Sequence, residues 1–311
     1  MDDIRPLLST IDEDRLQRSI FHLAADPLPY RKLNYTLPGH AQNTLYEADA
    51  WITKQLQGWG YAVEREAVPV QAFGFDPAKP KRHSYTRPAP AAPSYEAYNL
   101  FAGKTGRDHP EEIILLLAHK DSQSWVDSPG AYDNAVGVAA VLELARVLAG
   151  HPSRRSIRFL FCNEEHYPWT SVTAAQRARQ RGDNLNAIFN LDSLGGKSDE
   201  AIAAQAKTNV TLHTAPEGER LARLMAEMNE TFVIGLQQSS YRRARPGDDD
   251  GSFIQAGYTT AVANIGSYPY ADVQYHLEGD VPERVDVPNV RMAAQATLAA
   301  VLHLDQTGAA R

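Results

Sequence analysis

Short apolar runs alternate with helical patterns along most of the chain, and this alternation constrains the fold more than any other feature of the sequence. The runs 113–118, 157–161 and 187–191 have the continuous apolar character of strands that are buried on both faces. Between the first two runs, residues 134–148 carry an apolar stripe at helical spacing. Strands that alternate with helices indicate a largely parallel sheet covered by helices. We therefore predict the α/β class, as a single three-layer domain with a mostly parallel, mixed central sheet and helices on both faces.

Further segments extend the pattern on both sides. We predict helices over 12–25, 44–59, 173–181, 217–229 and 290–304, and strands over 61–70, 201–206 and 260–265. No internal repeat and no linker divides the chain, so we predict one domain over residues 1–311.

One segment interrupts the alternation. Residues 72–95 hold five prolines between Pro77 and Pro93, together with several basic residues. A loop of this length is unusual inside a compact domain. The segment is therefore either a surface excursion or an insertion that acts as a lid or a dimer contact. We divide the domain accordingly into N-terminal helices and a first strand (1–70), a Pro-rich loop insertion (72–95) and the core that carries the candidate site (96–311).

Composition and charge exclude several classes of protein. The net charge of −7 disfavours a nucleic-acid partner, because phosphate binding requires a basic face. Cys162 is the only cysteine, which excludes an intramolecular disulfide. No apolar stretch approaches the ~20 residues of a membrane helix, so we predict no membrane partner. No signal peptide is visible after Met1, which predicts a cytoplasmic protein.

Polar side chains follow the three apolar runs at the point where each run ends. His119 and Asp121 follow the first run, Glu164 and Glu165 the second, and Asp192 the third. In open α/β sheets, sites form in the crevice beyond the carboxyl ends of the strands. One polar residue at a strand's exit is common, but three strands that deliver histidine or carboxylate groups to one edge indicate a site.

The chemistry of these residues points to a metal. Adjacent acids at a buried strand end repel each other, and a zinc ion bound by Glu165 would leave Glu164 free as a general base. Histidine and carboxylate ligands are typical of catalytic zinc. Asp133 lies in the loop after His119. It is either a helix cap together with Asn134, or a carboxylate that reaches the same crevice and bridges two metals.

Five short segments occur in the order seen in the co-catalytic two-zinc aminopeptidases, a family that also includes glutaminyl cyclases and glutamate carboxypeptidases. They are Ala-His-Lys-Asp-Ser at 118–122, Pro-Gly-Ala-Tyr-Asp-Asn at 129–134, Asn-Glu-Glu at 163–165, Asn-Leu-Asp at 190–192 and Tyr-His at 275–276. The resemblance runs from about Tyr98 to the C-terminus. Each motif is weak by itself, whereas five in order are specific.

The resemblance implies a set of metal ligands and two zinc ions per chain. His119 and Asp192 resemble the ligands of one zinc, Glu165 and His276 resemble those of the other, and Asp133 would bridge them. Residues 1–311 would then be a single zinc-peptidase domain of the phosphorylase/hydrolase-like exopeptidase architecture, with its catalytic core at 96–311.

The resemblance also implies catalytic roles. Glu164 resembles the general acid/base, and Asp121 the carboxylate that orients His119. Tyr275 is a candidate to stabilise the oxyanion, and Tyr241 is a second candidate. Asp249 aligns with a recurrent Ser-Asp-His segment of the family.

The chain departs from the family where the substrate would bind. The Gly-rich stretch that usually follows the Glu pair is replaced by His-Tyr-Pro-Trp-Thr-Ser at 166–171, and Asp250 stands where the family has histidine. Trp125 and Trp169 follow ligand motifs, so each either lines a side-chain pocket or is buried in the core. The segment 241–243, Tyr-Arg-Arg, is a candidate to contact a substrate carboxylate.

We therefore predict a zinc-dependent metallo-exopeptidase, specifically an aminopeptidase whose partner is a peptide with a free N-terminus. A glutaminyl cyclase, which uses one zinc to cyclise N-terminal glutamine, is the first alternative. A carboxypeptidase is less compatible, because the larger relatives carry added domains. A non-catalytic, peptidase-like binding domain is the remaining alternative, although such proteins typically lose metal ligands.

Overall fold

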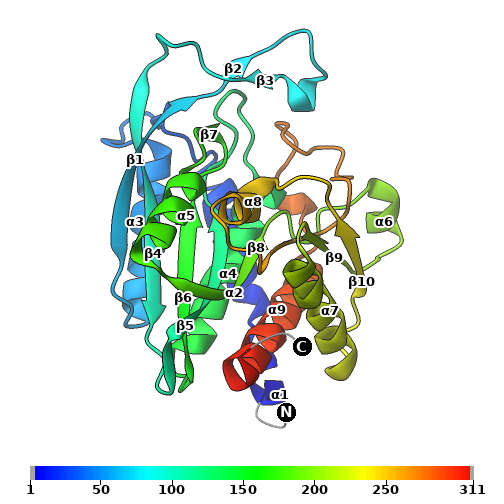
Figure 1. Cartoon of the computed structure of the whole chain (residues 1–311). Coiled ribbons are helices and arrows are strands. Elements are labelled where there is room, and N and C mark those ends of the chain that lie inside the picture. Colours follow the sequence, from blue (N-terminus) through cyan, green and yellow to red (C-terminus); the bar gives the residue numbers. More distant parts are fainter. Residues whose placement is uncertain (1–3, 309–311) are drawn as a thin grey trace.

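A nine-stranded sheet runs through the computed structural model, which describes residues 4–308 (Figure 1). The strand order is β10-β9-β11-β8-β5-β6-β4-β1-β7. The strands are β1 (Glu64–Ala72), β4 (Ser94–Lys104), β5 (His109–His119), β6 (Arg155–Cys162), β7 (His166–Tyr167), β8 (Asn184–Leu191), β9 (Thr208–His213), β10 (Gln237–Arg242) and β11 (Ala261–Ile265).

The sheet is parallel at its centre and mixed towards its edges. β6, β5, β8 and β11 are parallel neighbours, while β4, β1 and β7 add antiparallel strands on one side. On the other side β9 pairs antiparallel with β11 and parallel with β10. The mixed α/β sheet predicted from the sequence is confirmed, with its parallel part where the apolar runs lie.

The side chains of β5 show why the central strands are apolar on both faces. Successive residues of a strand point to opposite sides of a sheet. Alternate residues of β5 accordingly join two different apolar clusters. The larger cluster takes Ile114, Leu116 and Ala118, and the smaller one takes Ile113, Leu115 and Leu117.

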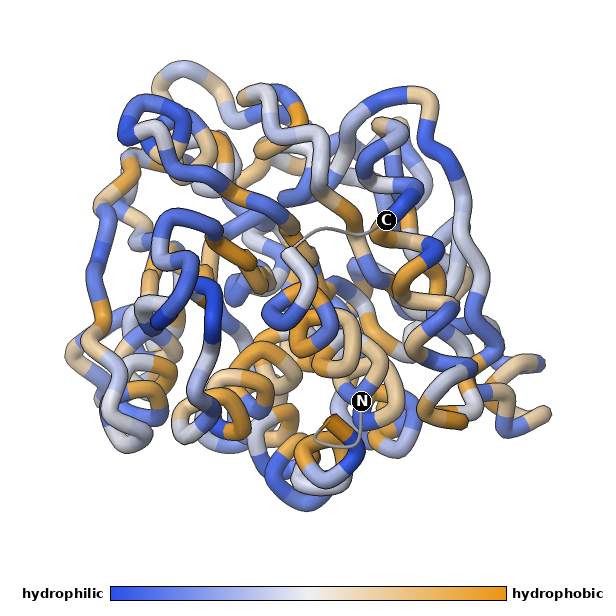
Figure 2. The backbone as a smooth tube through the Cα atoms, turned by 60° about the horizontal axis from the view of Figure 1, so that its bottom comes forward, coloured by the Kyte–Doolittle hydropathy of each residue, from blue (hydrophilic) through white to orange (hydrophobic). Residues whose placement is uncertain are grey.

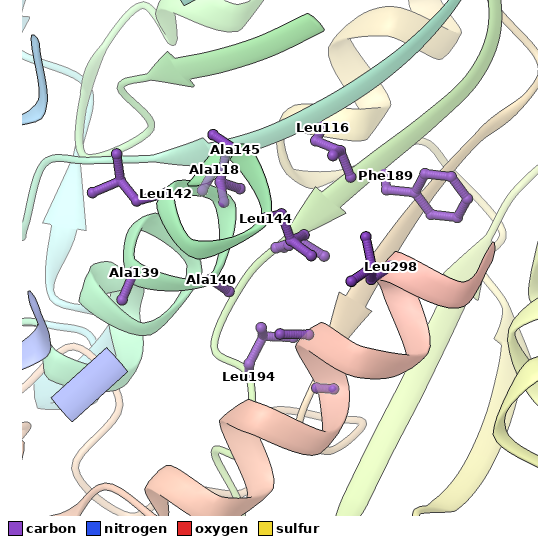
Figure 3. Close-up of a cluster of buried hydrophobic side chains, with 14 of the residues drawn as sticks. Leu116, Ala118, Ala139, Ala140, Leu142, Leu144, Ala145, Phe189, Leu194 and Leu298 are labelled. Carbon is purple, nitrogen blue, oxygen red and sulfur yellow. The ribbon is translucent and has the colours of Figure 1, made fainter. Parts of the chain in front are cut away.

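Helices cover both faces of the sheet. The larger cluster contains residues of α1 (Ile4–Leu8), α2 (Glu13–Ala24), α3 (Thr44–Gly58), α4 (Val136–Ala149), α7 (Pro216–Thr231) and α9 (Val287–Thr307). The smaller cluster contains residues of α5 (Thr170–Arg181) and α8 (Asp248–Gln255). Figure 3 shows Leu144 of α4 and Leu298 of α9 beside Leu116 and Phe189 of the sheet. The apolar stretches of the backbone gather in the middle of the molecule (Figure 2).

Most predicted elements lie where the periodicity places them, but one is wrong. The segment 201–206, predicted as a strand, overlaps the short helix α6 (Asp199–Ala203). Its alanines favour a helix, and the Ser198 side chain caps it by accepting a hydrogen bond from the backbone N–H of Ala201. The strand of this region, β9, begins only at Thr208. The edge strand β10 was not predicted, because its residues are polar and mostly exposed.

The segment 72–95 connects the antiparallel neighbours β1 and β4. It contains a small hairpin of β2 (Gly74–Phe75) and β3 (Tyr85–Thr86), with a single 3-10 turn, η1 (Lys81–His83), between the two strands. We call residues 73–87 the roof hairpin. It lies at the opposite end of the molecule from α1 (Figure 1).

Within residues 4–308, none of the helices combines the length and the apolar character that a membrane crossing requires.

Candidate metal centre

The carboxyl ends of three neighbouring strands converge on one place. β8, β5 and β6 are adjacent and parallel. β5 ends at His119, Glu165 lies shortly after β6, and Asp192 follows β8 directly. The edge of the sheet therefore brings together the groups that the strand-end pattern predicted.

Two groups of candidate metal ligands form there, and they share one residue. His119, Asp133 and Asp192 make the first group, and Asp133, Glu165 and His276 make the second. In the first, His119 Nε2 lies 3.0 Å from Asp133 Oδ1 and 3.5 Å from Asp192 Oδ1. In the second, His276 Nε2 lies 2.9 Å from Asp133 Oδ2 and 3.4 Å from Glu165 Oε1. Asp133 thus offers one oxygen to each group.

The five side chains fit a metal site. Each is at most 5 % exposed, so three carboxylates are buried within one cluster. Asp133 Oδ2 is a buried acceptor that receives no hydrogen bond, even though the His276 ring nitrogen is 2.9 Å away. Buried carboxylates are costly unless cations compensate them, and this donor set of imidazole nitrogens and carboxylate oxygens suits zinc.

Asp133 is held in place by backbone contacts that the sequence did not reveal. The Asp280 carboxylate accepts hydrogen bonds from the backbone N–H groups of Tyr132, at 2.8 Å, and Asp133, at 3.0 Å. Asn134 takes the capping role, since its Oδ1 accepts a hydrogen bond from the backbone N–H of Gly137. Asp133 is therefore free of the capping function and faces the two histidines.

Close packing fixes Asn134 against the strand that leads to Asp192. The Asn134 Nδ2 donates to the Leu191 carbonyl at 2.8 Å. A Cβ atom on Gly137 would lie 2.1 Å from that same carbonyl oxygen. Glycine is needed at this position because the helix α4 starts directly against the end of β8.

Asp121 organises two ligand loops at once. Its Oδ1 lies 3.4 Å from His119 Nδ1, as expected for a carboxylate that orients a metal-binding histidine. It also accepts hydrogen bonds from the backbone N–H groups of Glu164 and Glu165, and it lies 2.7 Å from His166 Nδ1. Although burial opposes it, contact with the two histidines holds the pKa of Asp121 below its ordinary value.

Glu164 and Glu165 occupy different environments although they are adjacent. Burial and the carboxylates of Asp249 and Asp248 raise the pKa of Glu164 well above its ordinary value. Glu164 Oε2 is buried and receives no hydrogen bond. Glu165 joins the second ligand group, whereas Glu164 lies outside both groups and lines the adjoining cavity.

The cavity beside the ligands has a volume of about 440 Å³ and is rich in aromatic side chains. Phe73, Tyr85, Tyr167, Trp169 and Tyr275 line it. Trp169 therefore faces the cavity, which is one of the two alternatives that the sequence left open. Trp125 instead stacks on Phe75 of the roof hairpin, at 5.9 Å between ring centroids.

Two tyrosines border the metal ligands. The Tyr275 ring stacks on His276 at 3.8 Å between centroids, and on Tyr270 at 4.7 Å. The Tyr270 hydroxyl, which the sequence did not single out, donates to Asp192 Oδ2 at 3.2 Å. Tyr241 lies on β10, is 45 % exposed and is not among the residues that line the cavity.

Arg243, Asp249 and Asp250 are not among the residues that line the cavity, although Asp248 is. Arg243 donates two hydrogen bonds to Asp250, at 2.8 and 2.6 Å, and a further bond to Asp248. Asp249 is fully buried and accepts a hydrogen bond from Cys162 Sγ at 3.1 Å. Arg243 is therefore already neutralised by carboxylates of the chain itself.

The roof hairpin supplies a contact to a candidate ligand. His276 Nδ1 lies 3.1 Å from the Arg82 carbonyl, and the Tyr85 ring packs edge-on against His276 at 5.7 Å. Metal-binding histidines generally donate their second ring N–H to such an acceptor. The two partners are 194 positions apart in the sequence, which explains why no sequence pattern indicated this contact.

A buried arginine ties the loops of His119 and Asp133 together. Arg31 is fully buried and donates to the carbonyls of Lys120, Pro129 and Gly130 at 2.7, 2.7 and 2.8 Å. Lys120, also buried, donates to Asn163 Oδ1 at 2.9 Å. A charged residue in an N-terminal loop has no local signal for such a role, so only the structure identifies Arg31.

The sequence of the chain resembles those of known proteins. Residues 99–301 match the family model described as Peptidase family M28. A "Probable zinc metalloprotease" of Pyrenophora teres f. teres is 27 % identical over 251 residues, which cover 68 % of this chain and 52 % of that protein. The chain thus spans about half the length of that curated relative.

Two solved structures share the fold. The Legionella pneumophila LapA aminopeptidase superposes with a TM-score of 0.72 at 15 % identity, covering 100 % of this chain and 75 % of that one. A glutaminyl cyclase from Bacteroides thetaiotaomicron superposes with a TM-score of 0.71 at 16 % identity, covering 94 % and 97 %. Since an aminopeptidase and a cyclase match equally well, the fold does not distinguish the two activities.

Proposed function

The chain belongs to peptidase family M28, and we propose that it is a zinc-dependent aminopeptidase that removes N-terminal residues from peptides. The observation that carries this proposal is the pair of buried ligand groups that share Asp133. A carboxylate with one oxygen towards each of two histidines suits two metal ions a short distance apart. The curated relative named as a probable zinc metalloprotease supports zinc as the metal.

In this proposal His119 and Asp192 would hold one zinc ion, and Glu165 and His276 would hold a second. Asp133, which belongs to both ligand groups, would be shared between them. When bound, zinc supplies Lewis acidity, which polarises a carbonyl group and makes water acidic enough to act as a nucleophile near neutral pH.

Glu164 acts as the general acid/base. Its Oε2 has no partner within the described residues, and its carboxylate borders the cavity where a scissile bond would lie. In the metal-free protein, burial and the neighbouring carboxylates raise the pKa of Glu164, which favours proton uptake by this group. Glu164 takes a proton from the attacking water and passes it to the leaving amine.

Tyr275 is proposed as the hydrogen-bond donor to the oxyanion. Its ring lines the cavity and is fixed by stacking on His276. Burial and the nearby Asp133 carboxylate raise the pKa of Tyr275 well above its ordinary value. The phenol therefore keeps its proton in the metal-free protein and can act as a hydrogen-bond donor.

Two features support cleavage next to a free N-terminus. The side of the cavity formed by Glu164, Glu165 and Asp248 is acidic, which attracts the α-ammonium group of a peptide. The roof hairpin, whose Tyr85 and Thr86 line the cavity, limits the length of chain that extends past the ligands.

A substrate panel tests the proposal. Amino-acid p-nitroanilides, Gln-initiated peptides and N-acetylated peptides are assayed side by side, with and without a chelator and after zinc is restored. An aminopeptidase releases free amino acids from unblocked substrates, loses activity with the chelator and regains it with zinc. Conversion of Gln-initiated peptides to pyroglutamyl peptides without release of amino acids would instead identify a cyclase. A metal-loaded protein that turns over none of these substrates would favour a binding domain.

A further inference from the structure

The roof hairpin differs in charge from the molecule that it covers. It contains Lys79, Lys81, Arg82 and Arg87 but a single acid, Asp76, whereas the whole chain has a net charge of −7. All four of the basic residues are exposed. A basic segment at the mouth of a site attracts anionic groups to that site.

Side chains of both charges line the cavity. Glu164, Glu165 and Asp248 line it next to the metal ligands, and Lys79 and Arg87 line it from the hairpin. A substrate whose ammonium group faces the acids presents the rest of its length to the two cations. The arrangement favours a substrate that carries an ammonium group at one end and a negative charge further along.

Of these two cations, Arg87 is the one that is free to bind. The Lys79 ammonium donates to the Tyr85 carbonyl at 2.9 Å and lies 3.7 Å from Asp76. Within residues 4–308, Arg87 has no carboxylate within 4.0 Å and makes no hydrogen bond through its side chain. The other arginine beside the site, Arg243, is occupied by Asp248 and Asp250.

The surroundings of Arg87 orient its guanidinium group. Its Cζ lies 5.2 Å from the centroid of the Tyr167 ring, which also lines the cavity. An arginine next to an aromatic ring keeps its donors available in the plane of the guanidinium. Two parallel N–H donors in a fixed fork match the two oxygens of a carboxylate.

We propose that Arg87 forms a subsite for a carboxylate of the substrate, so that the enzyme prefers peptides that carry this charge near the scissile bond. The carboxylate is either the C-terminal group of a short peptide or the side chain of an acidic residue. This inference rests on the proposed aminopeptidase function and adds a specificity to it. Arg243, which the sequence suggested for such a role, is excluded by its own ion pairs.

Three matched pairs of peptides separate the sources of the carboxylate. Leu-Ala and Leu-Ala-amide differ only at the C-terminal group. Leu-Glu-amide and Leu-Gln-amide differ only at the second side chain, and Glu-Ala-amide and Gln-Ala-amide differ only at the first. In the pair whose carboxylate reaches Arg87, we expect kcat/KM for the acid to exceed that for the amide roughly fivefold, mainly through KM. The preference decreases in high salt, because the subsite is exposed.

Substitutions of Arg87 test whether this residue causes the preference for the acid over the amide. Arg87→Ala brings the acid-to-amide ratio in that pair towards one, and Arg87→Lys retains part of it, because a lysine keeps the charge but not the fork. Lys81→Ala is the matched control. It removes one positive charge from the same hairpin, but Lys81 does not line the cavity and instead pairs with Glu278. Its ratio therefore remains that of the unaltered protein.

The outcomes distinguish this inference from the proposed function. If the zinc-loaded protein hydrolyses none of the six peptides, the aminopeptidase proposal fails. If it hydrolyses them with equal efficiency for acid and amide in every pair, the carboxylate subsite is overturned while the aminopeptidase stands. The subsite is also overturned if Arg87→Ala and Lys81→Ala change the ratio equally, since the effect is then one of general charge.

Discussion

The floor of the cavity and the roof hairpin are built in different ways. The floor consists of the ligand-bearing segments 119–122, 163–166 and 192, which are buried almost throughout. Several hydrogen bonds hold each segment, as with the backbone N–H groups of Glu164 and Glu165 on Asp121. The roof hairpin instead contacts the rest of the site through aromatic rings such as those of Phe75 and Tyr85, and through few polar contacts. The polar contacts are the Phe73 N–H to the Ser124 hydroxyl at 2.9 Å, the Arg82 carbonyl at His276, and the exposed Lys81–Glu278 ion pair at 2.9 Å.

This difference in construction suits the floor to catalysis and the roof hairpin to substrate selectivity. A reaction needs groups held to within a fraction of an ångström, which redundant buried hydrogen bonds provide. Selectivity needs a surface that tolerates change, and an exposed hairpin between two adjacent strands is such a surface. Changes in the floor should therefore affect turnover, metal binding and stability, and changes in the roof should mainly affect KM.

The largest expected effect lies in the floor. Glu164→Gln keeps the size of the side chain but removes its ability to take a proton. We expect kcat to fall by about 10³-fold while zinc stays bound, because general acid–base catalysis contributes about 10²–10⁴-fold. Peptide kinetics and metal analysis on the same sample measure both quantities. Full turnover by this variant would remove Glu164 from the mechanism.

Stability should also depend on the floor. Arg31→Met leaves the carbonyls of Lys120 and Pro129 without their donor and removes one of the two donors of the Gly130 carbonyl. We expect the free energy of unfolding to fall by about 3 kcal/mol or more, measured by urea denaturation in the presence of a chelator. The control is Arg18→Met, an exposed position on α2, for which we expect a change within about 0.5 kcal/mol. Equal losses in the two variants would show that Arg31 does not support the ligand loops.

Asp280 links the floor to metal binding. Asp280→Asn keeps the shape of the side chain but replaces one of the two carboxylate oxygens with an amide nitrogen. The hydrogen bonds from the backbone N–H groups of Tyr132 and Asp133 are therefore weakened. We expect zinc affinity to fall about 10–100-fold, the usual cost of altering the groups that support a ligand. Competition with a chromophoric chelator measures it, and Asp108→Asn on the exposed surface serves as the control. Unchanged affinity would mean that Asp133 does not need Asp280.

Zinc affinity should rise with pH. In the metal-free protein, burial lowers the pKa of His276, but Glu165 and Asp133 beside it outweigh burial and raise it to about 10. His276 therefore carries a proton at neutral pH, and zinc must displace it. We expect up to about tenfold tighter binding per pH unit for each proton displaced, from titrations at pH 6, 7 and 8. A pH-independent affinity would exclude His276 as a ligand.

We expect the smallest effect, a change of KM, from the ion pair of the roof hairpin. Lys81→Glu and Glu278→Lys each turn an attractive pair into a repulsive one. We expect KM to change roughly threefold in each variant and to return towards its original value in the double variant, because exposed ion pairs contribute about 0.2–1 kcal/mol. The unfolding temperature of each variant is the companion measurement. A loss of kcat as large as that of Glu164→Gln would show that the roof takes part in the chemistry.

Strands with a continuous apolar run were predictable, whereas the interior strands β4 and β9 and the edge strand β10 were not. The runs around Leu116, Phe159 and Phe189 are apolar because both of their faces are buried, so composition alone indicated strands. β10 has polar, exposed residues and is a strand only because β9 pairs with it. The error at 201–206 arose because an apolar run of alanines does not by itself distinguish a strand from a short helix.

The same division holds within the site. His119, Glu165 and Asp192 were predictable because each lies at the end of a recognisable strand. The sequence leaves Asp133 open between helix cap and ligand, and the structure gives the cap to Asn134, whose Oδ1 accepts a hydrogen bond from the backbone N–H of Gly137. His276 was indicated only by family resemblance, because a loop residue far along the chain carries no local signal of its neighbours.

The sequence by itself determined the α/β class, the strand ends that meet at one edge of the sheet and the chemical type of the site, since all three follow from local periodicity and residue type. Only the tertiary structure decided that Asp280 holds Asp133, that the Arg82 carbonyl faces His276 and that Arg87, not Arg243, is free to bind a substrate. These facts are distances between segments that are far apart in the chain. Local patterns do not encode such distances, because they are fixed only when the core packs.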